Sequence, residues 1–261
     1  KSGQDQFEWI IGEAPVMVRI ADEAQRAAAA AASVLITGET GTGKEVLAQA
    51  IRFSGPRAEK PFVPVNCAAL PETMIESELF GHEAGAFTGA TKRKPGLMEV
   101  ADGGILFLDE ISSTKPDMQA KLLRVLDEQR FRRIGGVNEI HVDVQIIAAS
   151  NRNLLSMMEQ GSFREDLYYR LKVVDLHLPP LRERIADVPA LVGSFIRQLN
   201  VRTGNVVSGI TPRAIDALKA HPWPGNIREL RHAVERAMLF CDDEQLDVGH
   251  FSPEFQALIA S

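Results

Sequence analysis

The sequence has no excess of basic charge and no long apolar run, and each absence excludes a class of protein. Its 261 residues carry 29 Lys and Arg against 35 Asp and Glu, which gives a formal net charge of −6. This balance, with a sequence pI of about 5.6, argues against a strongly basic DNA-binding surface over the whole chain. No apolar stretch approaches the about 20 residues of a membrane-spanning helix, so we expect a cytoplasmic protein without a membrane partner.

Cysteine is scarce as well. Cys67 and Cys241 are far apart and have no His or Cys neighbours at the spacing of a metal site. We expect both to be small buried residues of a protein that is kept in a reducing compartment. Residues 1–4 lack the pattern of a signal peptide, and we expect them to be the edge of a piece cut from a longer protein. No internal repeat is visible.

What is present first is an alternation of apolar runs with segments of helical spacing. Continuous apolar runs predict strands at 33–37, 62–65, 105–108 and 142–149, and helical spacing predicts helices at 15–32, 46–51 and 118–126. Runs without polar alternation are typical of strands whose two faces are both covered by helices. The sequence therefore predicts an α/β fold with a mostly parallel sheet. Pro64 indicates either that its strand lies at a sheet edge or that the strand ends there.

The pattern changes at Pro179 and Pro180, beyond which no convincing strand is visible. Helices are predicted there at 186–200, 212–221 and 226–240. We divide the chain into an α/β part (1–178), a small helical part (179–255) and a tail (256–261).

A glycine-rich turn separates the strand 33–37 from the next helix. Its residues fit the pattern G-x-x-x-x-G-K and are Gly38, Glu39, Thr40, Gly41, Thr42, Gly43 and Lys44. Backbone N–H groups of such a turn surround phosphate oxygens, and the lysine adds a charge for the β- and γ-phosphates. The generic pattern ends in Ser or Thr, which binds magnesium, but Glu45 stands here, so the metal must depend more on other groups. The alternative is a glycine-rich turn that binds nothing.

Two adjacent carboxylates follow the apolar run 105–108. Asp109 at a strand end can hold magnesium directly or through water, and Glu110 can polarise the attacking water. The alternative for such a pair is a helix N-cap. With a phosphate loop in the same chain, catalysis is the better interpretation.

Two asparagines also follow predicted strands. Asn151 could face the γ-phosphate and orient water, and Asn66 could hold Glu110 away from water until a partner docks. Each could instead be a turn-forming residue.

Arg164 and Arg170 lie in a segment where Ser162 and Glu165 form a capping-box pattern, which predicts the start of a helix. At about 100° per residue, the two arginines are about 120° apart around that helix, so we expect different roles. An arginine that reaches a neighbouring subunit's γ-phosphate would stabilise charge in the transition state. Pairing with Glu165 or Asp166 is the alternative.

A further arginine lies in the first turn of the helix predicted at 226–240. Since a cation there is unfavourable for the helix dipole, Arg228 suggests an external anion such as a nucleotide phosphate. Pairing with Glu229 or Glu235 is the alternative.

The most unusual stretch spells GAFTGA and comprises Gly85, Ala86, Phe87, Thr88, Gly89 and Ala90. Its composition suits neither a core strand nor an amphipathic helix, so it predicts a mobile loop that presents Phe87 and Thr88. The basic run 92–94 beside it could face DNA or an acidic partner, or be a solvated charged surface.

Together these motifs resemble the AAA+ ATPase domain of bacterial sigma-54-dependent transcription activators, the enhancer-binding proteins of the nitrogen-regulator type. The resemblance extends from about Ile11 to about Asp247 and rests on GETGTGKE, ESELFGHEAGAFTGA, LFLDE, FREDLYYRL, LPPLRER and WPGNIREL. GAFTGA is the most specific of them, because the phosphate loop alone would indicate only an NTPase. Glu45, unusual in a generic phosphate loop, agrees with this family.

The resemblance implies an AAA+ P-loop NTPase with ATP and Mg²⁺ as cofactors. It implies the following roles: Gly38 to Glu45 as Walker A, Asp109 and Glu110 as Walker B, Asn66 as the residue that restrains Glu110, Asn151 as sensor I, Arg228 as sensor II, Arg164 and Arg170 as arginine fingers, and Ile11 and Gly12 as adenine contacts.

The resemblance also implies partners. Residues 85–90 would be the tip of a loop that contacts sigma-54, and 112–118 a second loop that moves with it. The expected partners are the sigma-54 RNA polymerase holoenzyme and further copies of the chain in a ring, a hexamer; promoter DNA would be contacted through a DNA-binding domain outside this chain. Competing hypotheses are another kind of AAA+ remodeller and a non-enzymatic nucleotide- or DNA-binding module. GAFTGA argues against the first, and the intact Lys44 and Glu110 argue against loss of hydrolysis.

Overall fold

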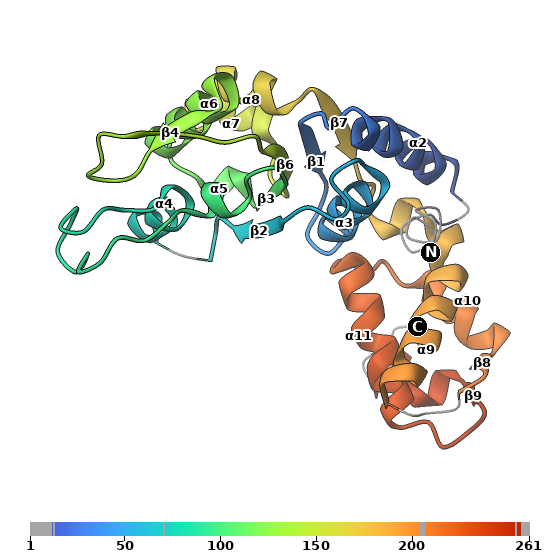
Figure 1. Cartoon of the computed structure of the whole chain (residues 1–261). Helices are drawn as coiled ribbons and strands as arrows, with labels where there is room; N and C mark the ends of the chain where they lie inside the picture. Colours follow the sequence, from blue (N-terminus) through green and yellow to red (C-terminus); the bar gives the residue numbers. More distant parts are fainter. Residues whose placement is uncertain (1–11, 13, 70, 204–206, 254, 257–261) are drawn as a thin grey trace. The chain divides into compact units, whose positions relative to one another are not determined.

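The computed structural model describes residues 12, 14–69, 71–203, 207–253 and 255–256. It divides into two compact units (Figure 1). The sheet unit comprises Glu23–Thr37 and Glu45–His177, and the helical unit comprises Lys1–Asp22, Gly38–Lys44 and Leu178–Ser261. The division expected from the sequence, with its cut after residue 178, stays a prediction.

The sheet unit is built on a five-stranded sheet in which every neighbouring pair is parallel. Its order is β2-β3-β6-β1-β7, with β1 at Val34–Thr37, β2 at Phe62–Asn66, β3 at Ile105–Asp109, β6 at Gln145–Ser150 and β7 at Val174–His177. The strand that contains Pro64 is an edge strand, as expected. Strand β7 at the other edge escaped the sequence analysis because its burial alternates and it forms no continuous apolar run.

Both faces of this sheet are covered. Successive side chains of a strand point to opposite faces, yet every residue of β6 is buried, as are the first four of β3. The core continues into the helices, where Leu79, Leu122 and Leu167 are among its buried members. The predicted fold class, a mostly parallel sheet between helices, is confirmed.

The helices associated with this sheet are α2 (Pro15–Ala29), α3 (Lys44–Ser54), α4 (Glu72–Phe80), α5 (Leu97–Val100), α6 (Pro116–Glu128), α7 (Leu154–Glu159) and α8 (Glu165–Leu171), and α6 packs on α8. Three of them, α2, α3 and α6, match predicted ranges with shifts at their ends, whereas α4, α5 and α7 were not predicted. A hairpin of β4 (Arg130–Arg132) and β5 (Glu139–His141) follows α6.

Strand β6 begins three residues later than the predicted 142–149. Asp143 is diverted from the strand because its N–H donates to Asp102 Oδ1 and its carbonyl accepts from Arg57 Nη1, each at 2.8 Å. These hydrogen bonds involve residues far away in the sequence, so the local pattern could not predict the later start of β6.

The helical unit contains three main helices, α9 (Val188–Thr203), α10 (Pro212–Ala220) and α11 (Asn226–Leu239). They pack around Trp223, whose Nε1 donates to Leu218 O at 2.7 Å. The expectation of no strand after Pro180 was wrong, since β8 (Gly209–Ile210) and β9 (Gln245–Leu246) form a short parallel pair. Two residues per strand are too few to show a period in the sequence.

The two cysteines differ. Both are free; Cys67 is buried as predicted, whereas Cys241 is only half-buried, with its Sγ 3.3 Å from Asp243 O. Among the described residues, no helix is both long and apolar enough to cross a bilayer.

Candidate functional site

The glycine-rich loop 38–44 adopts a backbone that other residues would disfavour. Gly38, Gly41 and Gly43 have φ angles of 151°, 81° and 103°. A Cβ on Gly41 would lie 2.2 Å from Gly225 O, and one on Gly38 would lie 2.6 Å from Leu178 O. Glycine is therefore required both for the turn and for the close approach of neighbouring backbone.

The side chain of Lys44 folds back and donates hydrogen bonds to the backbone of this loop. Lys44 is buried, and its Nζ donates to Gly38 O at 2.9 Å and to Glu39 O at 3.1 Å. Thr42 Oγ1 donates to the same Glu39 carbonyl at 2.8 Å. The loop thus holds a positive charge against its own backbone, which is the arrangement that phosphate binding needs.

Arg228 lies beside this loop in the helical unit. Its backbone N–H donates to Gly41 O at 3.3 Å, and its side chain is exposed in the first turn of α11. The two carboxylates proposed as partners are engaged elsewhere: Glu229 accepts from Gly225 N, and Glu235 pairs with Arg202. Within the described part of the chain the Arg228 guanidinium has no ion pair, so it is available to an external anion.

Of the two predicted adenine contacts, Ile11 lies outside the described residues. Gly12 is buried, and a Cβ there would overlap the Asp187 carboxyl group at 1.7 Å from its Cγ. Asp187 Oδ1 also accepts from Ala14 N at 2.9 Å. Gly12 and Ala14 are thereby held close to Asp187 within the helical unit.

Four other predicted site residues meet at the carboxyl edge of the sheet. Asn66 and Asp109 are register partners at the ends of β2 and β3, and Glu110 follows directly. Asn151 follows β6, and its N–H donates to Glu110 Oε2 at 3.4 Å. Parallel strands end at one edge, so residues distant in the sequence converge there.

Glu110 has a strained backbone. Its φ of 54° and ψ of 46° place a non-glycine residue in the left-handed region, at a cost of about 1–2 kcal/mol. Its side chain makes no capping bond to the short helix η1 (Ile111–Ser113) that follows, so the helix-cap alternative does not hold for it. Strain of this kind concentrates at functional sites.

Asn66 adopts the turn that was its alternative role. Its Oδ1 accepts from Ala68 N at 2.9 Å, and among the described residues it makes no hydrogen bond to Glu110. Its restraining role stays a prediction.

The neighbouring Cys67 indicates the electrostatic character of this edge. Burial, and then the charges of Asp109 and Glu110, raise the pKa of its thiol to about 12. Asp109 and Glu110 place two carboxyl groups at this edge, and carboxylates are ligands that suit a cation such as Mg²⁺.

The capping-box prediction around Ser162 was wrong. Helix α8 begins at Glu165 with Arg164 as its N-cap, and Ser162 Oγ instead donates to Met157 O at 3.1 Å. Since Arg164 precedes the helix, the angle calculated between the two arginines does not apply either.

Both arginines make exposed ion pairs. Arg164 binds both oxygens of Asp166, at 3.0 and 2.7 Å, which is the predicted alternative. Arg170 pairs with Asp127 at 3.0 Å and donates to Leu126 O, on α6 rather than on its own helix. Because exposed ion pairs contribute little to stability, both guanidinium groups can exchange their partners for a stronger anion.

The GAFTGA residues form a closed turn on the surface. Gly85 N donates to Ala90 O at 2.7 Å, and Ala90 N donates to Phe87 O at 3.0 Å. Phe87 is 45% exposed and Thr88 is also exposed, so the turn presents both side chains. The Phe87 ring stands edge-on to His82, with centroids 5.1 Å apart.

The β4–β5 hairpin supports this turn. The sequence analysis predicted neither the hairpin nor its contact with the turn. His82 forms isolated bridges with both Lys94 and Ile134, and a Cβ on Gly135 would lie 2.8 Å from Ala86 Cβ. Figure 1 shows the 81–95 segment and the hairpin projecting in the same direction from the sheet unit. The glycine pair 135–136 before an alternating segment was the available signal. The expected second loop at 112–118 stays a prediction.

Arg133 joins the hairpin to the base of the turn. It is buried and donates to Glu83 at 2.8 Å and to Glu99 at 2.8 and 2.5 Å. Burial acts to raise the pKa of Glu99, but hydrogen bonds from Arg133 and from Gly96 N outweigh it and hold that pKa below its usual value. The hairpin is thus held to the turn by charge as well as by packing.

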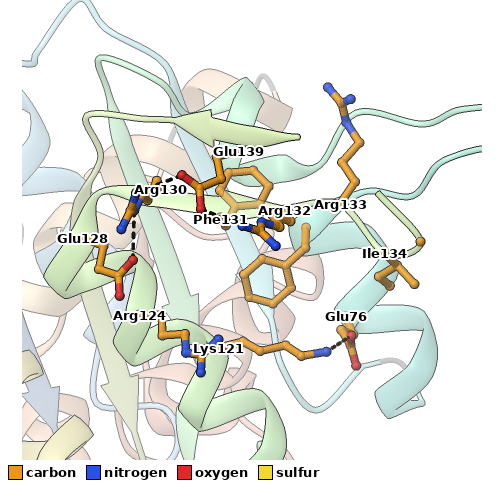
Figure 2. Close-up of a pocket in the computed structure, with 12 residues that line it drawn as sticks. Glu76, Lys121, Arg124, Glu128, Arg130, Phe131, Arg132, Arg133, Ile134 and Glu139 are labelled. Atoms are coloured by element: carbon orange, nitrogen blue, oxygen red, sulfur yellow. Dashed lines mark hydrogen bonds and ion pairs between the residues drawn. The ribbon is translucent and has the colours of Figure 1, made fainter. Parts of the chain in front are cut away.

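A pocket of about 470 Å³ lies between α4, α6 and the hairpin (Figure 2). Ion pairs cross it: Lys121 on α6 pairs with Glu76 on α4, and Arg130 pairs with both Glu128 and Glu139. Helix α4, which leads into the GAFTGA turn, is therefore linked to α6 by a pair that solvent can reach.

Comparison with known proteins supports this arrangement. The family model described as the sigma-54 interaction domain matches residues 10–177, and the AAA+ ATPase lid domain model matches residues 182–260. The Nif-specific regulatory protein of Azotobacter vinelandii is 52% identical over 242 residues, covering 92% of this chain and 46% of the relative. The regulatory protein AtoC of Escherichia coli K12 is 50% identical over 234 residues, covering 90% and 51%.

Solved structures agree. NtrX from Brucella abortus, in complex with ADP, is 39% identical with a TM-score of 0.86, over 95% of this chain and 55% of that one. Hsp104 from S. cerevisiae, at 19% identity and a TM-score of 0.66 over 91% and 46%, shares the fold alone. The chain spans about half the length of the relatives it matches. It belongs to the sigma-54 interaction domain family, with the AAA+ ATPase fold and an AAA+ lid domain.

Proposed function

We propose that this chain hydrolyses ATP within a ring of subunits and uses the energy to remodel the sigma-54 RNA polymerase holoenzyme, so that the promoter opens. The observation that carries the proposal is the pairing of two features in the sheet unit. One is the acidic, strained carboxyl edge at Asp109 and Glu110, and the other is the exposed GAFTGA turn on its charged support. The first suits ATP hydrolysis and the second suits contact with a partner.

Nucleotide binding is assigned to Gly38–Glu45, with Arg228 on the phosphates and Ile11 and Gly12 at the adenine. NtrX, at 39% identity, is described in complex with ADP and with ATP, which supports the same ligands here. We take 1–178 as the α/β domain and 179–255 as the lid.

Hydrolysis is assigned to the carboxyl edge. Mg²⁺ binds through one or two carboxylates together with substrate phosphates, so Asp109 suffices as its main protein ligand. Asp109 would hold the ion, whose chemistry there would be to neutralise charge on the phosphates. Glu110 polarises the attacking water, Asn151 orients it, and Asn66 restrains Glu110 until the partner docks.

Ring assembly is assigned to Arg164 and Arg170, which would act on the γ-phosphate of a neighbouring subunit. Their ion pairs are exposed and weak enough to exchange. A hexamer is the proposed ring. The sigma-54 contact is assigned to Gly85–Ala90, and promoter DNA to a domain outside this chain.

Two variants test the hydrolysis assignment. Glu110→Gln should retain ATP binding and lose ATP turnover, whereas Lys44→Ala should lose binding itself. The wild-type rate per subunit should rise with protein concentration as rings assemble. A rate that stays constant from the monomeric to the assembled range would contradict arginine fingers acting across an interface.

Thr88→Ala tests the output loop. We expect it to retain most ATPase activity and to lose open-complex formation with sigma-54 polymerase on a promoter. Val137→Ala, at an exposed position between the two strands of the hairpin, is the control and should open promoters normally. If Thr88→Ala opens promoters as the wild type does, the role of the loop is wrong.

A further inference from the structure

The phosphate loop carries a carboxylate, and the helical unit holds it. Both guanidinium nitrogens of Arg182 donate to Glu39, Nη1 to Oε2 at 2.9 Å and Nη2 to Oε1 at 2.7 Å. Asn226 Nδ2 donates to the same Oε2 at 3.2 Å. We call this cluster of Glu39, Arg182 and Asn226 the loop clamp. Glu39 belongs to the phosphate loop, whereas no role has been assigned above to Arg182 or Asn226.

Asn226 is built into this position. It is the first residue of α11, fully buried, with a φ of 55° that asparagine tolerates better than most side chains. Besides Glu39, its Nδ2 reaches Thr40 O at 3.0 Å, and its Oδ1 accepts from Leu181 N at 2.8 Å. One amide thus joins the phosphate loop, the segment 181–184 and the start of α11.

A second arginine of the same segment reinforces the contact. Arg184 is 2% exposed, and its Nη2 donates to Thr42 O at 2.9 Å. The segment 181–184 therefore binds the loop at two points, through the Glu39 carboxylate and through the Thr42 carbonyl.

The loop clamp also neutralises the Glu39 carboxylate within the phosphate loop. A carboxylate in a loop that receives phosphates repels them, unless a cation neutralises it and holds it aside. Glu39 and Arg182 are 44% and 47% exposed, so their pair adds little to folding stability. Its effect is instead expected on the ligand, which carries several negative charges.

We propose that Arg182 and Asn226 are positioning residues that couple the phosphate loop to helix α11. The inference rests on the proposed ATP binding and adds a route for it: closure of the loop around phosphates moves Glu39 and Thr40, and Asn226 passes this movement to the first turn of α11. Arg228 lies two residues further on, with its N–H on Gly41 O. Since coupling is reciprocal, the position of α11 also sets the affinity of the loop.

Equilibrium binding of ATP and ADP, and the ATPase KM and kcat, test the arginine. Arg182→Ala should weaken ATP binding by about three- to tenfold, more than ADP binding because ATP carries more charge, and should raise KM with little change in kcat. Adding Glu39→Gln should restore the affinity to that of Glu39→Gln alone, since the repelling charge is gone. Arg197→Ala, an exposed arginine of α9 without an ion pair in the described residues, is the control.

Amide hydrogen exchange tests the coupling apart from activity. In the wild type, ATP should slow exchange at the start of α11, and this response should be lost in Asn226→Ala while the rest of the fold exchanges as before. Should Asn226→Ala fail to fold, Arg182→Ala gives the same readout at an exposed site. The inference would be overturned if Arg182→Ala left the ratio of ATP affinity to ADP affinity unchanged, or if Glu39→Gln did not restore the affinity. It would also be overturned if ATP still slowed amide exchange at the start of α11 in the variants. A wild type that binds no ATP would overturn the proposed function as well, so the two failures are distinguishable.

Discussion

The molecule contains two glycine-rich loops that use glycine for different reasons. In the phosphate loop, backbone atoms crowd against the glycines, and a Cβ on Gly41 would lie 2.2 Å from Gly225 O. In the GAFTGA turn, Gly85 and Gly89 also have positive φ, but no atom lies within 4 Å of the positions that their Cβ atoms would occupy. The first loop is embedded and the second is presented, although both are rich in glycine.

This contrast assigns different work to the two loops. An embedded loop with a buried lysine can enclose a small ligand and report on it to the residues that press against it. A presented turn with an exposed Phe and Thr can contact a large partner. Four changes test this contrast, in decreasing order of expected effect. They alter the glycines of both loops, the Arg133 support of the GAFTGA turn, the charge of Glu99 and the exposed Phe87.

The largest effect is expected at the glycines. Gly41→Ala should abolish ATP binding, because the methyl group forces the loop away from Gly225. Gly85→Ala should cost only the positive-φ penalty of about 1–2 kcal/mol and leave ATP binding intact. Isothermal titration with ATP and urea unfolding measure the two effects. Gly103→Ala, also at positive φ in open space, is the control; equal ATP affinities for the Gly41 and Gly85 variants would refute the distinction.

The support of the presented turn comes next. Arg133→Ala leaves Glu83 and Glu99 without their shared cation and should destabilise the fold by about 2–4 kcal/mol. Arg132→Ala, at the adjacent position in the same hairpin but 58% exposed with one partner, should cost less than about 1 kcal/mol. Urea midpoints at constant m-value compare them. Similar midpoints would mean that Arg133 does not hold the hairpin to the turn.

A smaller effect is expected in acid. Because the pKa of Glu99 is lowered in the folded protein, its contribution to stability is fully present above its unfolded pKa, about 4.3, and is lost as pH falls through the lower folded value. The wild type should therefore lose stability more steeply than Arg133→Ala in this range. Unfolding free energies between pH 6 and the acid limit of folding, at fixed ionic strength, give the slopes; parallel slopes would contradict the assignment.

The smallest effect on the fold is expected at the tip. Phe87→Ala removes a half-exposed ring and one edge-on contact with His82, so it should lower stability by less than about 1 kcal/mol and leave the ATPase rate unchanged. Only contact with the partner should suffer, which a binding assay with sigma-54 measures. A large loss of ATPase activity would show that the tip is part of the catalytic structure.

Much of this organisation follows from local sequence. The continuous apolar runs predicted buried parallel strands, because a strand covered on both faces has no need of polar alternation. Asp109 and Glu110 were singled out after one predicted strand, and Asn66 and Asn151 after two others. The structure brings these four to one edge, since parallel strands end together. Arg228 was singled out because it stands where the helix dipole disfavours a cation, and its role as a phosphate contact stays a prediction.

Other features depend on distant residues and carry no local mark. Strand β7 alternates because it lies at an edge, and β6 starts late because Asp102 and Arg57 bind Asp143. The capping box at Ser162 failed because Met157 O takes the serine hydroxyl. The clamp on Glu39 and the support under the GAFTGA turn join residues 143 and 50 positions apart. Local chemistry thus indicated which residues are suited to bind phosphate or to contact a partner, whereas packing decided what holds them, because only folding brings such distant charges within hydrogen-bond reach.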